Sequence, residues 1–440
     1  MTPHTDAPEG PSLRRLADAA EDRLGEHGLA LRDLGVLGPE DPAASHFAAA
    51  VERGFYETVP TGAALRQQLE AHAADGRRRL GVYAPGDDPA ARRPAATFED
   101  FVQPLTTWPG RTVDAWLITD VTVSPDARDA GLCAAALTAT EAAIYGRFGF
   151  GAATRWHAVR IDVSGAPAFT GAPAGGRVTV EEPREIPGLV DELYGRVLPA
   201  TPGSVQRTSF SVPRWEDREA SRNEGRGSGL YAAVHRDDDG RVQGVALYRF
   251  EGWEKEPPTI TVTAFLAATA DARRGLVHHL ARLDLVERIE WGRAPEPGWL
   301  EALFVDERRV SRHRGSDDLY LRVLNLPAAM AARGWAGDGE VVVAVEDALG
   351  AIDGTWRLTV RQGRGAAERL GPAADAVGLG AGLRLDAARF SALWLGGHSR
   401  GAGAAVLAEA GVVAELRAGA AEAFDGLVRP SRPLHTLVGF

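Results

Sequence analysis

Sulfur is scarce in this chain, whose 440 residues include one cysteine, Cys133, and two methionines. A lone cysteine excludes an intrachain disulfide and a zinc site built from several thiolates. The histidines show no spacing typical of metal ligands, so we expect no metal.

Long apolar runs are missing as well. None reaches the ~18 residues that a membrane-spanning helix requires. The N-terminal segment MTPHTDAPEGPSLRR contains no basic stretch followed by an apolar one, so we expect no signal peptide. We therefore expect a cytoplasmic protein without a membrane partner.

Positive charge is in deficit. The chain has 49 Lys and Arg against 60 Asp and Glu, a net charge of −11. This balance argues against a nucleic-acid partner and favours a cationic small molecule, such as an amine. The length predicts two to four domains, and a hydrophobic content of 45% is ordinary for a globular protein.

The order of patterns predicts an α+β chain in three parts. Helical periodicity followed by alternation indicates a first domain at 1–164 and, after a Gly- and Ala-rich linker, a second at 177–318. A third domain is expected at 319–440. In the first two domains, helices are expected at 43–55, 63–74, 186–197 and 272–291, and strands at 79–83, 95–102, 113–123, 154–163, 230–235, 243–250 and 259–266. The repeated order suggests an internal duplication.

The octapeptide IYGRFGFG (144–151) places Tyr145 in a segment punctuated by three glycines. Glycines at this spacing predict a sharp bend or a close approach of another group. A tyrosine on such a bend can donate a proton to a leaving group. The last residue, Phe440, ends an apolar tail, and an apolar tail is expected to dock rather than fray.

Several stretches together resemble the Enhanced intracellular survival (Eis) family of N-acetyltransferases. They are VTVSPDARDAGL (121–132), TEAAIYGRFGFG (140–151), DLYLRVLNLPAAMAARGW (318–335) and the terminal phenylalanine. The resemblance spans nearly the whole chain. It implies two tandem GNAT domains, the second non-catalytic, then a sterol-carrier-protein-like domain, assembled as a homo-hexamer.

The resemblance also implies a mechanism. Tyr145 would be the general acid, and the free carboxylate of Phe440, docked into the first domain, would be the base. An α-carboxylate has an ordinary pKa near ~3.5, so the apolar tail would have to raise it by desolvation. The implied acetyl-CoA-binding residues are Val121, Val123, Arg128, Gly131, Leu132, Thr140 and Glu141. The implied substrate-binding residues are Phe55, Glu57 and Asp120.

The phosphate loop departs from the family pattern P-x-x-R-R-R-G-[LI]. Two of its three arginine positions are Asp129 and Ala130. Only the short segment 132–144 separates Gly131 from Tyr145. A helix of ~12 residues and a strand of ~5 do not fit into that interval. The cofactor site is therefore degenerate, and the chain binds acetyl-CoA or no cofactor.

Two further motifs compete with this interpretation. ADARRGL (270–276), before a helical pattern, is typical of a GNAT phosphate loop and indicates either a relocated cofactor or a solvated helix start. GHSRG (397–401) fits the nucleophile elbow G-x-S-x-G. Only Asp425 and His435 follow as possible triad partners, so a hydrolase is disfavoured.

Three functions remain open. The first is an Eis-like N-acyltransferase that moves an acetyl or acyl group from CoA to an amine of a cationic small molecule. The second is a repurposed enzyme that uses Tyr145 and the terminal carboxylate for acid–base chemistry without CoA. The third is a non-catalytic small-molecule-binding protein.

Overall fold

The computed structural model of the protein describes residues 24–25, 28–54, 58–119, 133–138, 142–183, 186–207, 229–294, 298–397, 403–430 and 432–439. The chain divides into two compact units. Unit 1 comprises residues 1–105, 113–153 and 319–429, and unit 2 comprises residues 106–112, 154–318 and 430–440. Since one compact unit can hold two domains, the three expected domain ranges stay predictions.

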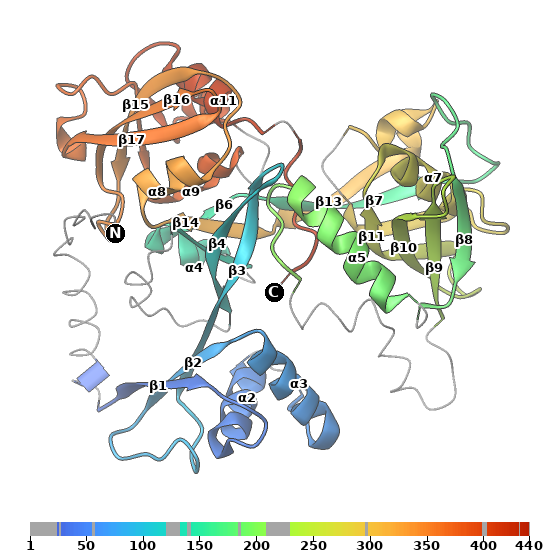
Figure 1. Cartoon of the computed structure of the whole chain (residues 1–440), viewed down its shortest axis with the longest axis horizontal. Coiled ribbons are helices and arrows are strands. Elements are labelled where there is room, and N and C mark those ends of the chain that lie inside the picture. Colours follow the sequence, from blue (N-terminus) through green and yellow to red (C-terminus); the bar gives the residue numbers. More distant parts are fainter. Residues whose placement is uncertain are drawn as a thin grey trace. The chain divides into compact units, whose positions relative to one another are not determined.

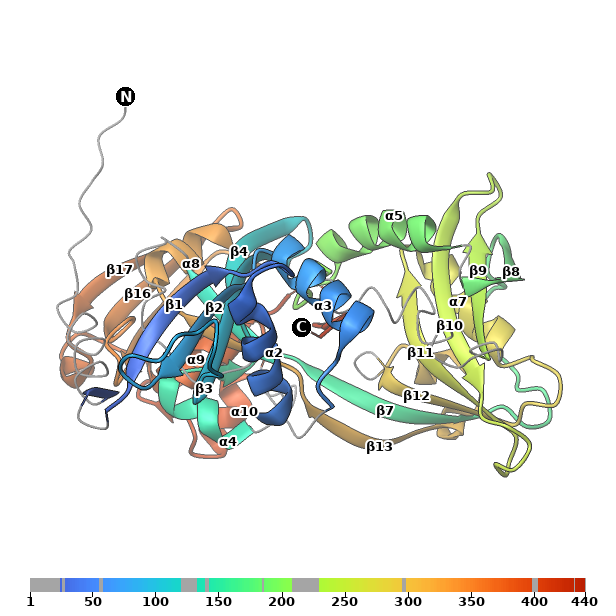
Figure 2. The same ribbon diagram turned by 90° about the horizontal axis from the view of Figure 1, so that it is seen from below.

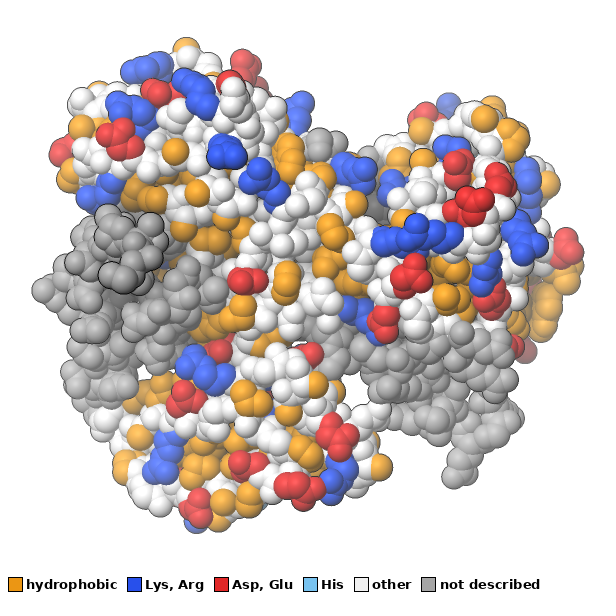
Figure 3. All heavy atoms as spheres, in the orientation of Figure 1, with side chains coloured by type: hydrophobic (Ala, Val, Ile, Leu, Met, Phe, Trp, Pro, Cys, Tyr) orange, Lys and Arg blue, Asp and Glu red, His pale blue; other side chains and the backbone are white. Residues whose placement is uncertain are grey.

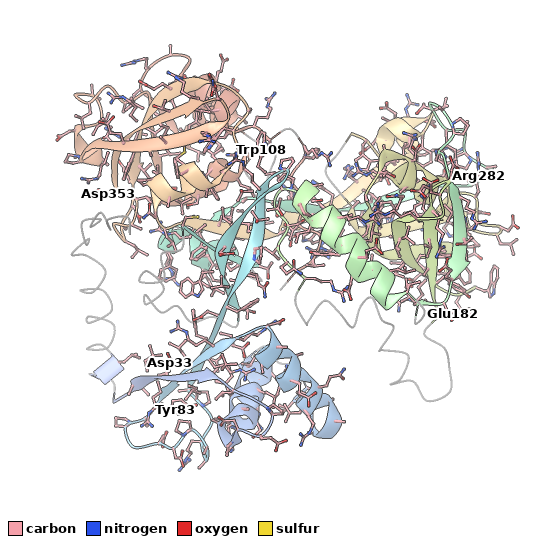
Figure 4. The ribbon with its side chains drawn as sticks, in the orientation of Figure 1. Asp33, Tyr83, Trp108, Glu182, Arg282 and Asp353 are labelled. Carbon is pink, nitrogen blue, oxygen red and sulfur yellow. The ribbon has the colours of Figure 1, made fainter. Side chains whose placement is uncertain are left out.

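Unit 1 contains a mixed sheet that runs through the first part of the chain. In its described residues the strand order is β1 (Ala30–Val36), β2 (Arg78–Tyr83), β3 (Ala96–Trp108), β4 (Arg111–Thr119), β5 (Ala134–Thr138), β14 (Leu319–Val323) and β6 (Gly151–Ala152). The tip of the β3–β4 hairpin, marked by Trp108 in Figure 4, is counted with unit 2. The strands predicted at 79–83 and 95–102 are confirmed as β2 and β3, and the strand predicted at 113–123 is confirmed as β4 up to Thr119, beyond which it lies outside the described residues.

Helices α2 (Pro42–Gly54) and α3 (Gly62–Ala74) lie beside β1 and β2 (Figure 2). Both helices were predicted from their periodicity. Phe47 and Leu69 form the centre of an apolar cluster with neighbouring alanines. A second cluster contains buried side chains from six strands, among them Leu80, Phe98, Trp116, Leu137 and Tyr320. The alternation of each strand therefore gives the sheet one apolar face.

A smaller sheet follows in the same unit. Its described order is β17 (Arg364–Gly371), β16 (Gly354–Arg361), β15 (Gly339–Glu346), β18 (Leu383–Asp386) and β19 (Ala414–Glu415). Its helices are α8 (Leu326–Ala332), α9 (Ala387–Leu395), α10 (Ala404–Glu409) and α11 (Ala420–Val428). Helix α9 packs against β14 and β6, so the C-terminal part and the first sheet form one body.

Unit 2 is built on a third sheet, which is also mixed (Figure 1). Its described strands lie in the order β13 (Val310–Asp317), β7 (Arg155–Asp162), β12 (Arg288–Ala294), β11 (Thr259–Ala267), β10 (Val242–Phe250), β9 (Leu230–Arg236) and β8 (Arg177–Glu181). Helices α5 (Pro187–Val197) and α7 (Ala270–Leu280) both pack on β10 and β11. Gly244 faces Leu276 of α7 whereas its neighbour Gln243 bonds Arg196 of α5, so the helices cover opposite faces.

The strand predicted at 154–163 has an unexpected partner. It is β7, and it pairs with β12 and β13 in unit 2 rather than with the first sheet, to which its position in the chain assigned it. Alternation identifies a strand but contains no information on its neighbours.

The long helix predicted at 272–291 is wrong in its second half. Helix α7 ends at Leu280, and Arg288 begins the strand β12. Between them Leu285 has φ +65°, a conformation that a helix cannot continue through. The helical periodicity holds as far as Leu280, and the pattern then changes to strand alternation.

Among the described residues, no helix combines the length and the apolar character needed to cross a bilayer.

Candidate functional site

Tyr145 is the last residue of the short helix α4 (Ala142–Tyr145), which follows β5. Its half-buried ring packs beside Phe150 and Tyr320, with ring centroids 6.4 and 6.3 Å away. The strand β5 is parallel to its neighbour β4. Among the described strands of the first sheet in unit 1, β4 and β5 are the only parallel neighbours. The octapeptide begins a few residues after β5 ends.

Two glycines of the octapeptide are required by close packing. Gly149 has φ +79°, and a Cβ there would collide with the guanidinium of Arg322. A Cβ on Gly151 would collide with the carbonyl oxygen of Ala388 in α9. The bend predicted from the glycines is confirmed, and its cause is the approach of β14 and α9.

An ion pair fixes Arg322 against this bend. Its Nη2 lies 2.7 Å from Oδ2 of Asp347, and both side chains are almost fully buried. The Asp347 carboxylate also accepts hydrogen bonds from the backbone N–H groups of Leu349 and Ile352. The loop that holds Asp347 lies between β15 and β16, where Figure 4 labels Asp353. The Tyr145 segment is thus supported by the C-terminal sheet.

Most residues assigned from the sequence lie outside the described residues. These are Phe55, Glu57, Asp120, Val121, Val123, Arg128, Gly131, Leu132, Thr140, Glu141 and Phe440. The structure does describe the ends of the flanking strands, at Thr119 of β4 and Ala134 of β5. The roles of the undescribed residues stay predictions.

The hydrolase motif is not supported. Ser399 lies outside the described residues. Asp425, one of its two possible partners, accepts hydrogen bonds from the backbone N–H groups of Ala404 and Ala405, at 2.6 and 3.0 Å. It thereby caps the start of α10, which is a structural task. In the described part of the chain, no three His, Cys, Asp or Glu residues form a group that could hold a metal ion.

Unit 2 contains a cavity of about 470 Å³ where two parallel strands diverge. Strands β11 and β12 pair from Thr259 to Val262 and from Arg288 to Trp291, and not beyond. The cavity opens at the end of this pairing. Its wall includes the continuation of both strands, the start of α7 and the tail 432–439.

Arginines from three separate segments line this cavity, namely Arg273 of α7, Arg293 of β12 and Arg432 of the tail. Arg293 forms an ion pair with Asp318. The guanidinium of Arg273 lies 5.2 Å from the ring centroid of Trp299. The sequence motif at 270–276 pointed to Arg273, but no local pattern linked it with Arg293 or Arg432.

The tail is hydrogen-bonded within unit 2. The backbone N–H of His435 donates to the carbonyl of Pro202 at 2.9 Å, and Ser204 Oγ donates to the carbonyl of His435 at 2.7 Å. Thr436 and Thr154 share a hydroxyl–hydroxyl bond of 2.6 Å. The tail is thus docked as far as it is described, and the predicted approach of Phe440 to the first domain stays a prediction.

Comparisons with known proteins agree with this architecture. Residues 203–323 match a family model described as an acetyltransferase (GNAT) domain, and residues 326–435 match one described as a sterol carrier protein domain. An uncharacterized N-acetyltransferase of Streptomyces avermitilis is 33% identical over 384 residues, 80% of this chain and 86% of that protein. N-acetyltransferase Eis of Mycobacterium tuberculosis is 32% identical over 279 residues, 61% of this chain and 63% of that protein.

Solved structures extend the similarity to the fold. Eis1 from Mycobacterium abscessus superposes with a TM-score of 0.73 at 25% identity, covering 93% of this chain and all of that one. A GCN5-related N-acetyltransferase from Anabaena variabilis gives a TM-score of 0.70 at 15% identity, covering 93% of this chain and 100% of that one, which shows likeness of fold alone.

Proposed function

The chain belongs to the Eis family of GNAT N-acetyltransferases, and from that premise we propose that it transfers an acetyl group from acetyl-CoA to the amine of a cationic small molecule. Its two GNAT folds and sterol carrier domain are those expected of the family. The observation that supports the proposal best is the placement of Tyr145. It comes shortly after the parallel strands β4 and β5, on a bend whose glycines pack against Arg322 and α9.

The chemistry needs two proton transfers. The amine loses a proton as its nitrogen bonds to the acetyl carbon, and the departing sulfur gains one as the C–S bond breaks. In our proposal the Phe440 carboxylate accepts the first proton and Tyr145 donates the second. Acetyl-CoA supplies the activated thioester, which the residues assigned to it between Val121 and Glu141 would hold.

The charge of the connection between β4 and β5 bears on how tightly acetyl-CoA can bind. Positions 120–133 contain three aspartates and one arginine. Such a segment fits the uncharged pantetheine arm of the cofactor better than its pyrophosphate. We therefore expect acetyl-CoA to bind weakly, with a KM above the usual micromolar range.

The preference for a cationic amine rests on the net charge of −11 and on Glu57, assigned to the substrate side. Hexameric assembly and a cytoplasmic location are further proposals, which follow from the family resemblance and from the sequence.

The proposal is tested by mixing the full-length protein with acetyl-CoA and a panel of polyamines and amino sugars while thiol release is recorded. Amine-dependent thiol release, with the acetylated amine identified by mass spectrometry, would support transfer. Calorimetric titration with acetyl-CoA separates the alternatives. Absence of binding at millimolar cofactor would exclude the transferase and leave CoA-independent acid–base chemistry or simple binding.

A further inference from the structure

The described wall of the cavity in unit 2 contains positive side chains and no negative ones. Its described lining includes Arg273, Arg293 and Arg432 but no Asp or Glu. Asp318 pairs with Arg293 from outside the lining. On the visible face of the same unit, by contrast, acidic and basic side chains lie side by side (Figure 3). Arginines gathered in a hollow of an acidic protein indicate an anionic ligand.

The start of α7 adds to this positive character. Helix α7 has 11 residues, and Thr269 and Ala270 at its N-terminus line the cavity. The backbone N–H groups and the dipole at a helix N-terminus favour an anion. The acidic residue of the first turn, Asp271, is engaged elsewhere, because its carboxylate accepts from the backbone N–H of Gly175 and from Arg274.

His435 provides a second, independent sign of a ligand. Its Nδ1 atom is buried and has no hydrogen-bond partner among the described residues, and His435 is one of the residues that line the cavity. Burial, followed by the charges of Arg293, Arg273 and His157, lowers the pKa of His435 to about 3. The imidazole is therefore neutral at physiological pH, and it can hydrogen-bond to a ligand without adding charge.

The remaining wall is apolar and aromatic. Phe265 and Trp291 lie with their ring centroids 4.7 Å apart, and Trp299 lies beneath Arg273. A volume of about 470 Å³ is that of a small-molecule site and exceeds the need of a free inorganic ion.

From these contacts we propose that the cavity of unit 2 binds a phosphate-bearing small molecule. Arg273 and Arg432 bind the phosphate at the N-terminus of α7, and the aromatic wall holds the organic part. Guanidinium groups bind phosphate through paired hydrogen bonds. The described lining of this cavity belongs to unit 2, whereas Tyr145 belongs to unit 1.

Ligand binding is thereby linked to docking of the tail. Arg432 and His435 belong to the tail and are part of the wall. A ligand that contacts them stabilises the docked tail, and a docked tail in turn raises the affinity for the ligand. The ligand would thus act on the segment that ends in Phe440.

The test is calorimetric titration of the full-length protein with inorganic pyrophosphate, ADP and CoA, with citrate as an anion that contains no phosphate. Arg273→Ala and Arg432→Ala should each weaken pyrophosphate binding roughly tenfold or more, the loss expected for a charge-assisted hydrogen bond. Arg357→Ala is the matched control, because it removes one exposed arginine that pairs with Glu368 in unit 1. It should leave the affinity unchanged.

Hydrogen exchange at 432–439 is the second readout. Pyrophosphate should slow exchange there in the unchanged protein but not in Arg273→Ala. If Arg273→Ala fails to fold, as judged by Tm, the same titrations and exchange measurements are made on Arg273→Lys and Arg432→Ala.

Three results would overturn the proposal. They are no binding of pyrophosphate or ADP at millimolar concentration, equal affinity in all variants, and citrate binding as tightly as pyrophosphate. Tighter binding of ADP than of pyrophosphate would identify a nucleotide, and tighter binding of CoA that Arg273→Ala abolishes would identify the cofactor itself. These outcomes do not depend on acetyl transfer, so the two proposals fail separately.

Discussion

The first sheet of unit 1 and the sheet of unit 2 each contain one pair of parallel neighbours among their described strands, and the connections within these pairs differ. In unit 1, the segment 120–133 joins β4 to β5, and in unit 2, the segment 268–287 joins β11 to β12. The longer connection, in unit 2, contains α7 with Arg273 and Arg274 near its start. The shorter one has a single arginine among three aspartates.

The segments that follow these parallel pairs also differ, and here unit 1 has the residue that unit 2 lacks. Behind β5 comes Tyr145 on its glycine bend, whereas the segment 295–309 behind β12 contains no tyrosine. The phenol that could protonate a leaving group and the cations that could bind a phosphate therefore belong to different units. A duplicated scaffold can divide features that a single GNAT domain combines.

The largest expected effect is on the phenol of unit 1. Tyr145→Phe should lower kcat for amine acetylation by ~10² or more, because positioned general acids contribute about that factor. Tyr231→Phe in β9 of unit 2 makes the same chemical change at an exposed site and should leave kcat unchanged. Steady-state thiol release measures both. Equal rates in the two variants would remove the acid role from Tyr145.

The glycine bend should be the next most sensitive feature. Gly149→Ala places a Cβ against Arg322 at φ +79°, and we expect a loss of roughly 2–3 kcal/mol in the free energy of unfolding. Gly146→Ala is the matched control, since nothing lies within 4 Å of its Cβ. Urea denaturation compares the two. A Gly149→Ala variant as stable as Gly146→Ala would contradict the packing explanation.

The charge of the short connection can be changed directly. The double variant Asp129→Arg, Ala130→Arg restores the arginine positions of the family loop and should lower the KM for acetyl-CoA by about tenfold through charge-assisted contacts to phosphate. Asp87→Arg, Ala90→Arg in the β2–β3 loop controls for net charge. An unchanged KM would show that the phosphates of the cofactor do not reach this connection.

The smallest expected effect concerns pH and the tail of unit 2. The pKa of His435 is lowered to about 3 in the folded state, below its ordinary value of ~6.5. The unfolded chain therefore binds the extra proton below pH ~6.5, and unit 2 should lose ~1 kcal/mol of stability between pH 6.5 and 5.5. In unfolding measurements, His435→Gln should flatten the dependence of stability on pH. His313→Gln, which replaces an exposed histidine of the same unit, is the control and should leave that dependence unchanged.

Local patterns in the sequence were sufficient to predict much of both sheets. Periodicity correctly located α2, α3 and α5 and most strands, and the glycines of IYGRFGFG predicted the bend at Tyr145. The prediction of a missing or very short helix before Tyr145 falls on the connection between β4 and β5, which lies outside the described residues, so it stays a prediction. Each of these features is decided by residues close together in the chain, through propensity, alternation or length.

Long-range contacts were beyond such patterns. The partner of β7, the support of Gly149 by Arg322, and the meeting of Arg273, Arg293 and Arg432 each join residues far apart in the chain. The sequence by itself determined the family, most of the helices and strands, and the candidate acid. Only the tertiary structure decided which cations share a cavity, because packing, not chain order, brings a tail and a distant helix together.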